Sequence, residues 1–197
     1  MAPASGRSPL SRQEVIDAAL ELVRQVGFDG LTMRGLSEKL GVTPMAAYYH
    51  VGDKDALLRE LAEEVRAQWI PLRLGPEGWQ ESLRRHLLSM WQEMHRHPGL
   101  GVYMMRTLPD MGRTTDATAA FFRQAGFEEP TATLAASFVL TYVLGRWSVD
   151  ARLSQTRRQT RARPGLRAQD HVEFSIGAMI AGLEALRSSS LSEGASA

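Results

Sequence analysis

The side chains best suited to chemistry in this chain lie between residues 31 and 54, and the chemistry that they suit is contact with double-stranded DNA. An arginine can pair with guanine O6 and N7, tyrosine can donate to phosphates, and small apolar side chains can touch the thymine methyl group. Arg34 is the main candidate for base recognition, and its alternative role is a solvated charge. The candidate DNA contacts are Arg34, Thr43, Pro44, Met45, Ala46, Tyr48, Tyr49, His50 and Lys54.

Two of these candidates are basic residues near helix ends. Lys54 falls in the first turn of a predicted helix, where the positive end of the helix dipole opposes a cation. A DNA phosphate would reverse that effect, so we expect Lys54 to contact phosphate and not merely to be exposed. For His50, a phosphate contact and a capping or packing role both remain open.

Two short helices, predicted to begin within a dozen residues of each other, would position these side chains. Thr32 can cap a first short helix, which Gly41 then ends. Thr43 can cap a second helix with Pro44 at its first position, where a missing N–H costs nothing. The spacing predicts a helix-turn-helix. Because one recognition helix reads few bases, the motif needs a symmetric dimer on half-sites about 34 Å apart or a multiple of that.

Helical periodicity continues through the rest of the chain. Ser11 and Glu14 form a capping box for a helix that ends at Gly27, and Asp53 can cap a helix that Pro71 stops. The sequence predicts a disordered arm over 1–10, an N-terminal domain with the helix-turn-helix and a connector helix over 11–70, a larger helical domain over 71–190, and a disordered tail over 191–197.

Within the larger domain, the periodicity predicts five helices separated by Pro, Gly or charged segments. Six arginines and no acidic residue lie between 151 and 167, which predicts a disordered basic loop. The helices are expected from 79 to Pro98, over 100–107, over 117–125, from Pro130 to about 150, and from about 170 to 187.

Methionine and aromatic residues are concentrated in these helices. Methionine fills irregular space and adapts to variable ligands, so a pocket for a small, largely hydrophobic molecule is expected among them. For each residue, an ordinary place in a helical core is the alternative. The candidates are Met90, Trp91, Met94, Tyr103, Met104, Met105, Phe121, Phe122, Phe138 and Tyr142.

The last predicted helix is apolar on two faces. One face carries large aliphatic residues that can pack on the same domain, and the other carries small residues that permit close approach of a second helix. We therefore expect a homodimer, with a central helix of a monomeric bundle as the alternative. The candidate interface residues are Phe174, Ala178, Ala181, Gly182 and Ala185.

Composition narrows the class of protein. Of the 197 residues, 44% are hydrophobic, which is enough to fill a globular core. The net charge is +1, and between Arg12 and Lys54 six acidic residues face five basic ones. Bulk charge therefore does not favour DNA binding, and the positions of individual charges must carry that inference. Because the chain has no cysteine, disulfides and thiolate metal sites are excluded.

Several other classes of protein find no support. No apolar run approaches the roughly 20 residues of a membrane span, and the N-terminal residues lack the apolar stretch of a signal peptide, so we expect a cytoplasmic protein without a membrane partner. No catalytic elbow, phosphate loop, nucleotide fingerprint or metalloprotease motif occurs, so we expect neither an enzyme nor a cofactor. His95 and His97 stand two apart and do not share a helix face, so we expect no metal site.

The strings Leu-Thr-Met-Arg, Leu-Gly-Val, Tyr-Tyr-His-Val and Lys-Asp-Ala-Leu-Leu, over 31–58, closely resemble the DNA-binding domain of the TetR family of bacterial regulators. The resemblance covers residues 11 to 70. The C-terminal half is similar in architecture to the tetracycline-repressor-like branch, including the Gly-x-x-x-x-Gly-Leu-Glu-Ala-Leu string over 177–186. Many members carry Phe where Val51 stands, but Val also occurs in this branch.

The resemblance implies an all-α protein. Three N-terminal helices would hold the helix-turn-helix, and a connector helix would join them to a larger helical domain for ligand binding and dimerisation. It also implies a ligand-responsive repressor that binds a pseudo-palindromic operator as a homodimer and is released by a small effector. The alternative is a helical ligand-binding or adaptor protein that has lost specific DNA binding.

Overall fold

The computed structural model describes residues 10–107, 111–156 and 167–194. These residues form nine helices and no strand, which confirms the all-α class. They divide into two compact units, each considered separately below. The first unit holds α1–α4 together with His95–Leu100, and the second holds Gln68–Met94 and the chain from Gly101 onward.

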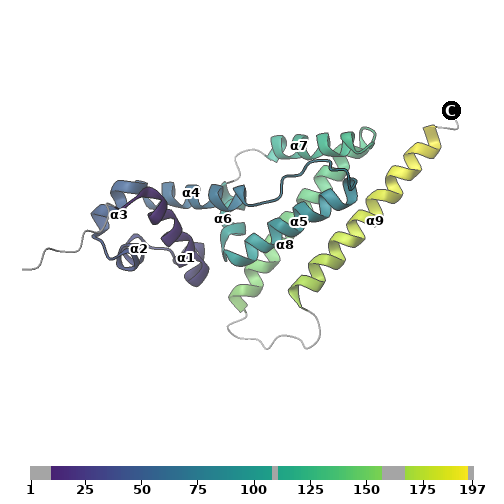
Figure 1. Cartoon of the computed structure of the whole chain (residues 1–197). Helices are drawn as coiled ribbons and strands as arrows, with labels where there is room; N and C mark the ends of the chain where they lie inside the picture. The colour runs from purple at the N-terminus through teal and green to yellow at the C-terminus, as the bar shows by residue number, and fades with distance from the viewer. Residues whose placement is uncertain (1–9, 108–110, 157–166, 195–197) are drawn as a thin grey trace, which may run out of the picture. The chain divides into compact units, whose positions relative to one another are not determined.

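The first unit is built on four helices that pack on one another (Figure 1). They are α1 (Arg12–Gly30), α2 (Met33–Leu40), α3 (Pro44–Val51) and α4 (Lys54–Ala67). The capping box that the sequence predicts is present, because Ser11 accepts from the Glu14 backbone at 3.2 Å and its own N–H donates to the Glu14 carboxylate at 2.7 Å. Apolar side chains from all four helices fill the core, among them Val15, Leu36, Ala47 and Leu61.

The helix α1 is broken at Gly27, where the sequence predicts its end. Gly27 has φ 78°, in the left-handed region that favours glycine. The next residue, Phe28, donates its N–H to the Pro98 carbonyl at 2.8 Å. A β-carbon at Gly27 would lie 3.2 Å from that same oxygen, so the close approach also favours glycine. This backbone contact joins the segment His95–Leu100 to the first unit.

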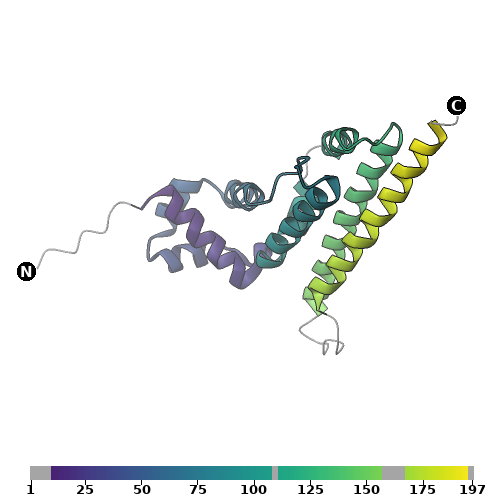
Figure 2. The ribbon, with the colours of Figure 1, turned by 45° about the vertical axis from the view of Figure 1, so that its right-hand side comes forward.

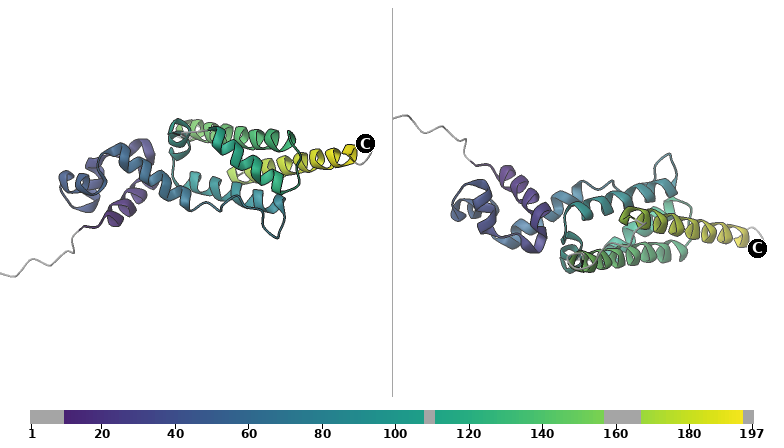
Figure 3. Two further views of the ribbon diagram at one scale, coloured as in Figure 1. Left: turned by 90° about the horizontal axis from the view of Figure 1, so that it is seen from above. Right: turned by 90° about the horizontal axis from the view of Figure 1, so that it is seen from below.

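The second unit contains five helices (Figures 2 and 3). They are α5 (Trp79–Arg96), of which residues up to Met94 belong to this unit, α6 (Leu100–Thr107), α7 (Met111–Gln124), α8 (Thr131–Thr156) and α9 (Ala168–Gly194). The helices α5, α8 and α9 run lengthwise through the unit. The helix α7 packs along α8, and an aromatic cluster closes the core with ring centroids 5.0 to 6.1 Å apart: Trp79, Phe121, Phe122 and Phe127.

Helix boundaries in the second unit differ from the prediction. The helix α7 begins at Met111, six residues before the expected 117, and its threonine hydroxyls bond within the helix: Thr115 Oγ1 donates to the Met111 carbonyl at 2.8 Å. The helix α8 runs to Thr156, into the loop expected over 151–167, because alanine, arginine, leucine and glutamine favour a helix and no proline intervenes there.

The C-terminal tail expected over 191–197 is also helical as far as Gly194, because neither proline nor glycine occurs between Leu183 and Glu193. The rest of this tail, residues 157–166 of the basic loop and residues 1–9 of the arm lie outside the described residues.

Candidate functional site

The helix-turn-helix consists of α2 and α3. Thr32 accepts the Gly35 N–H at 3.0 Å, and Thr43 accepts the Ala46 N–H at 3.3 Å with Pro44 in the first turn. Gly41 ends α2 in the left-handed conformation, with φ 67°. The cap predictions are therefore confirmed. The turn between α2 and α3 is short, and its backbone geometry fixes the orientation of α3 relative to α2.

The residues predicted to contact DNA lie on the surface of the first unit. The side chains of Met45 and Tyr49 are 78% and 86% exposed, although both are large and apolar or aromatic. Such exposure is unfavourable unless another molecule covers the side chains. Arg34, Thr43, Pro44 and Tyr48 are also exposed, whereas Ala46, His50 and Lys54 are half-buried.

Arg34 forms an ion pair with Glu38 one turn later in α2. The Arg34 Nε donates to Glu38 Oε1 at 2.9 Å, and this hydrogen bond raises the pKa of the guanidinium above its ordinary value. Both side chains are well exposed, so the pair adds little stability. It uses only one of five guanidinium N–H groups, which leaves the others able to reach a base.

Lys54 and His50 lie on opposite sides of the turn between α3 and α4. Asp53 accepts the Ala56 N–H at 2.7 Å and so caps α4, whose first residue is Lys54. Within the described parts of the chain, Lys54 forms no ion pair. The His50 ring meets Tyr49 edge-on, with ring centroids 5.4 Å apart. A cation without a local partner is well placed to meet a phosphate.

Arg12 is a functional candidate that sequence reasoning missed. Its Nε and Nη2 donate to the two carboxylate oxygens of Glu60 at 2.8 and 2.7 Å, and its Nη1 donates to the His50 carbonyl at 2.9 Å. One side chain on α1 thereby joins the end of α3 to α4. The partners are 38 and 48 residues away, so no local pattern could have revealed this connection.

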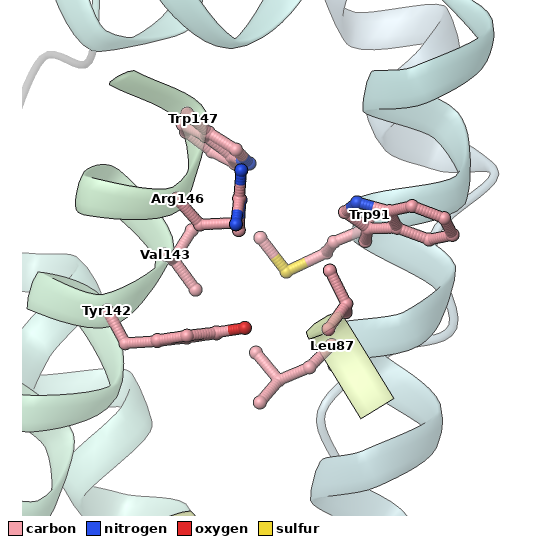
Figure 4. Close-up of a pocket in the computed structure, with 8 residues that line it drawn as sticks. Leu87, Trp91, Tyr142, Val143, Arg146 and Trp147 are labelled. Carbon is pink, nitrogen blue, oxygen red and sulfur yellow. The ribbon is translucent and has the colours of Figure 1, made fainter. Parts of the chain in front are cut away.

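A pocket in the second unit lies between α5, α8 and α9 (Figure 4). Its cavity volume is about 20 Å³, roughly the room that one water molecule needs. Three predicted ligand residues, Met90, Trp91 and Tyr142, come together here. The remaining lining residues were not predicted: Leu87, Val143, Arg146, Trp147 and Val172.

The other predicted ligand residues do not line this pocket. Phe121 and Phe122 belong to the buried aromatic cluster, and Met104 is buried. Met105 is exposed, Met94 and Tyr103 are half-buried, and Phe138 is 53% exposed. Apolar character in the sequence therefore marks three different environments in this unit: pocket, core and surface.

One wall of the pocket contacts the segment that follows α4. The Trp147 ring lies 6.4 Å from the ring of Trp69, two residues after the end of α4. The next residue, Ile70, is held on both sides of its backbone: its N–H donates to Ser89 Oγ at 2.9 Å, and its carbonyl lies 2.6 Å from His86 Nδ1. Burial lowers the pKa of His86, so the neutral ring donates to that carbonyl.

The five residues predicted for the dimer interface all lie on the exposed face of α9. Phe174 is 77% exposed. In addition, α8 presents an exposed stripe at intervals of three and four residues, which we call the α8 stripe: Leu134, Phe138, Thr141, Gly145 and Val149. By length and composition alone, Thr131–Asp150 is apolar enough to cross a membrane, as the core helix of a globular protein can also be, and about one third of it is buried. Its apolar character reflects one face in the core and one on the surface.

Two glycines lie on these exposed faces without a local reason. A β-carbon at Gly145 or Gly182 would meet nothing within 4 Å. Glycine inside a helix costs about 1 kcal/mol relative to alanine. Packing within the unit therefore does not require glycine at either position.

The two histidines expected not to bind a metal lie at the end of α5 and just beyond it. His97 is fully buried and its Nε2 accepts from Arg24 Nε at 3.2 Å. In the part of the chain that the structure describes, no group of three or more His, Cys, Asp or Glu residues is placed to hold a metal ion.

The comparisons with known proteins agree with this architecture. Residues 15–61 match the family model of bacterial regulatory proteins, tetR family, and residues 71–176 match that of the tetracyclin repressor-like C-terminal domain. The chain is 36% identical over 140 residues to the class D tetracycline repressor protein of Escherichia coli, covering 69% of this chain and 64% of that protein. It thus spans slightly under two thirds of the length of this relative.

Solved structures give the same result. The structure of TetR from Acinetobacter baumannii AYE has a TM-score of 0.69 at 30% identity, covering 90% of this chain and 98% of the other. A variant of that protein in complex with minocycline has a TM-score of 0.65 at 30% identity, with the same coverage.

Proposed function

Because the chain belongs to the TetR family of bacterial regulatory proteins, we propose that it is a ligand-responsive repressor that binds a pseudo-palindromic operator as a homodimer. The observation that carries this proposal is the exposed surface of α3. The helix α3 presents Met45 and Tyr49 to solvent, and the neighbouring helix α2 presents the exposed Arg34. Together they fit a partner that offers thymine methyls, guanine edges and phosphates.

Contacts with DNA divide between two tasks. Arg34 reads a guanine, and Pro44, Met45 and Ala46 at the start of α3 contact thymine methyl groups. Tyr48, Tyr49, His50 and Lys54 contact phosphates and fix the orientation of the motif without reading sequence. Specificity therefore depends on few hydrogen bonds, and correct placement of α3 matters more than the number of charges.

The homodimer forms through the α8 stripe and the exposed face of α9. Exposed aromatic residues on both helices and glycines that face open space support this assignment. Two copies of each helix would form a four-helix interface, in which small residues allow the helices to approach closely. A symmetric interface of this kind places two recognition helices on two half-sites.

The effector is a small, largely hydrophobic molecule that binds in the pocket between α5, α8 and α9. The minocycline complex of the Acinetobacter baumannii protein supports a ligand of this general character. A molecule that widens this pocket displaces Trp147, and with it Trp69 and the backbone that continues α4. Because α4 begins beside the helix-turn-helix, displacement at its far end releases the operator.

The test is a titration of the protein against DNA from upstream of its own gene, followed by fluorescence anisotropy at two salt concentrations. We expect tight binding to one segment, with an affinity that falls steeply as salt rises. Binding that neither prefers a sequence nor depends on salt would favour the alternative, a ligand-binding or adaptor protein that has lost specific DNA binding. We expect such a repressor to act in the cytoplasm, where the bacterial DNA lies.

Effector candidates can be found before the operator is identified. A thermal-shift screen of hydrophobic drugs and metabolites detects any compound that binds the native state, because such binding raises the unfolding transition. A compound that raises the transition and also releases the DNA would establish the regulatory link. Compounds that raise the transition and leave the DNA complex unchanged would count against it.

A further inference from the structure

The pocket contains one buried hydroxyl, that of Tyr142, for which the described residues supply no hydrogen bond of normal geometry. We propose that the effector carries a neutral oxygen acceptor, such as a ketone or quinone carbonyl, on an otherwise apolar ring skeleton, and that the Tyr142 hydroxyl donates to this oxygen. This inference rests on the proposed function, because it specifies the ligand of the same pocket.

The Tyr142 hydroxyl carries the main observation. Its oxygen is buried and finds no hydrogen-bond partner among the described residues. The nearby Ser175 hydroxyl interacts with the Tyr142 oxygen closely enough to lower the phenol pKa, but it donates its own hydrogen to the His171 carbonyl at 2.8 Å, and the two hydroxyls form no hydrogen bond of normal geometry. Figure 4 shows the Tyr142 ring extending from α8 into the space between the helices, with its oxygen at the far end. A buried donor without a partner is unfavourable, and a ligand acceptor would satisfy it.

The protonation state of Tyr142 makes it a donor. Burial raises the pKa of this phenol above its ordinary value of about 10. At neutral pH the hydroxyl therefore keeps its hydrogen. A group with an accepting oxygen satisfies such a hydroxyl without any proton transfer.

The charge of the pocket favours a neutral acceptor over a carboxylate. Arg146 lines the pocket, but it forms an ion pair with Asp150, with Nε 3.0 Å from Oδ2 and Nη2 against Oδ1. The pair is neutral overall. A ligand carboxylate would lose its hydration and meet a guanidinium whose charge Asp150 already balances. A ketone loses much less on leaving water.

The remaining walls favour a flat ring skeleton. Trp91 and Trp147 present aromatic surface, and aliphatic side chains complete the lining. The cavity of about 20 Å³ is too small for a ring without rearrangement. Met90 supplies the adaptable side chain, because an unbranched thioether changes rotamer at low cost.

The experiment uses three probes that share one skeleton: tetralin, 1-tetralone and tetralin-1-carboxylate. Isothermal titration calorimetry measures their binding to the full chain and to Tyr142→Phe. We expect 1-tetralone to bind about tenfold more tightly than tetralin, the gain of one buried hydrogen bond, and the carboxylate to bind more weakly than the ketone. In Tyr142→Phe, the ketone should fall to the affinity of tetralin, while tetralin itself is unchanged.

The control variant is Thr107→Val, which removes an exposed hydroxyl of α6 that does not line the pocket and should leave all three affinities unchanged. Tyr142→Phe should fold at least as stably as the parent chain, because it removes an unsatisfied buried group. Equal affinities for ketone and hydrocarbon, tighter binding of the carboxylate, absence of saturable binding by 1-tetralone, or an equal loss of both neutral probes in Tyr142→Phe would each overturn the proposal.

The outcome is separate from that of the DNA titration. A chain that fails to bind its upstream DNA but discriminates 1-tetralone from tetralin through Tyr142 would refute the repressor and leave this pocket chemistry intact. A chain that binds its operator but shows no such discrimination would refute only the inference about the ligand.

Discussion

Truncation of Phe174 provides a sharp test of the proposed dimer interface. This side chain is 77% exposed in a protomer, so Phe174→Ala opens no cavity in the core and should leave the protomer folded. An aromatic side chain buries about 150–250 Å² when it is fully covered. At roughly 25 cal/mol per Å², burial of the exposed part against a partner contributes about 3 kcal/mol for each Phe174.

Symmetry doubles this effect, because each residue of a two-fold interface occurs twice. The loss is therefore about 6 kcal/mol per dimer, which corresponds to an increase of roughly ten-thousandfold in the dimer dissociation constant. Sedimentation equilibrium over a range of protein concentrations measures this constant. We expect Phe174→Ala to be largely monomeric at concentrations where the parent chain is dimeric.

The matched control is Tyr49→Ala, since Tyr49 is an aromatic residue of similar exposure on α3 of the first unit. It should leave the dimer dissociation constant unchanged and weaken only DNA binding. Truncation of Phe138, on the α8 stripe, should weaken the dimer as Phe174→Ala does. If Phe174→Ala and Tyr49→Ala gave the same dissociation constant as the parent chain, the exposed face of α9 would not be the interface.

Three further perturbations test the DNA interface and the segment after α4. Arg34→Ala should weaken operator binding by roughly tenfold to a hundredfold and relax the preference at one base pair. Lys54→Ala should weaken binding to all sequences and reduce the slope of log affinity against log salt by about one per contact. Fluorescence anisotropy on mutated operators separates the two effects, and equal effects of both variants on every sequence would refute these roles. Arg12→Gln should weaken binding to the operator without changing the salt dependence of the affinity, because the Arg12 guanidinium is bound by Glu60 and by the His50 carbonyl and not by DNA. A weaker salt dependence in this variant would instead indicate that Arg12 contacts a phosphate. Burial lowers the pKa of His86, so the imidazole is protonated at a higher pH in the unfolded chain than in the folded one. The neutral ring therefore contributes fully to the free energy of unfolding above about pH 6.5, the ordinary pKa of histidine, and contributes less as the pH falls below that value. Chemical denaturation should therefore show a decrease in the free energy of unfolding from about pH 7 to pH 5 that is shallower in His86→Asn, and identical pH profiles would contradict this assignment.

Local rules allowed much of the first unit to be predicted. The caps at Ser11, Thr32 and Thr43, the break at Gly27 and the helical start at Pro44 all follow from hydrogen bonds and steric limits within about four residues. The same rules predicted a loop from residue 151 and a tail from residue 191, whereas α8 continues to Thr156 and α9 to Gly194. Charge and serine content lower helix stability only slightly, and neither proline nor glycine lies within residues 151–156 or 183–193 to end these helices.

The candidate pocket shows where such reasoning ends. Periodicity identifies apolar residues of α5 and α8, but it does not decide which of two apolar faces turns inward. Phe122 and Phe138 look alike in the sequence, yet the first is fully buried and the second half exposed. Trp147 and Arg146 acquire their roles only because α5 and α9 pack against their side of α8.

The sequence by itself determined the helix-turn-helix, its caps and the residues on its surface, because these depend on interactions between near neighbours along the chain. The tertiary structure alone decided which methionine and aromatic side chains form a pocket, which residue joins α3 to α4, and which face of α8 stays uncovered. Such choices depend on packing between helices that are distant in the sequence, and packing selects partners by shape as well as by hydrophobicity.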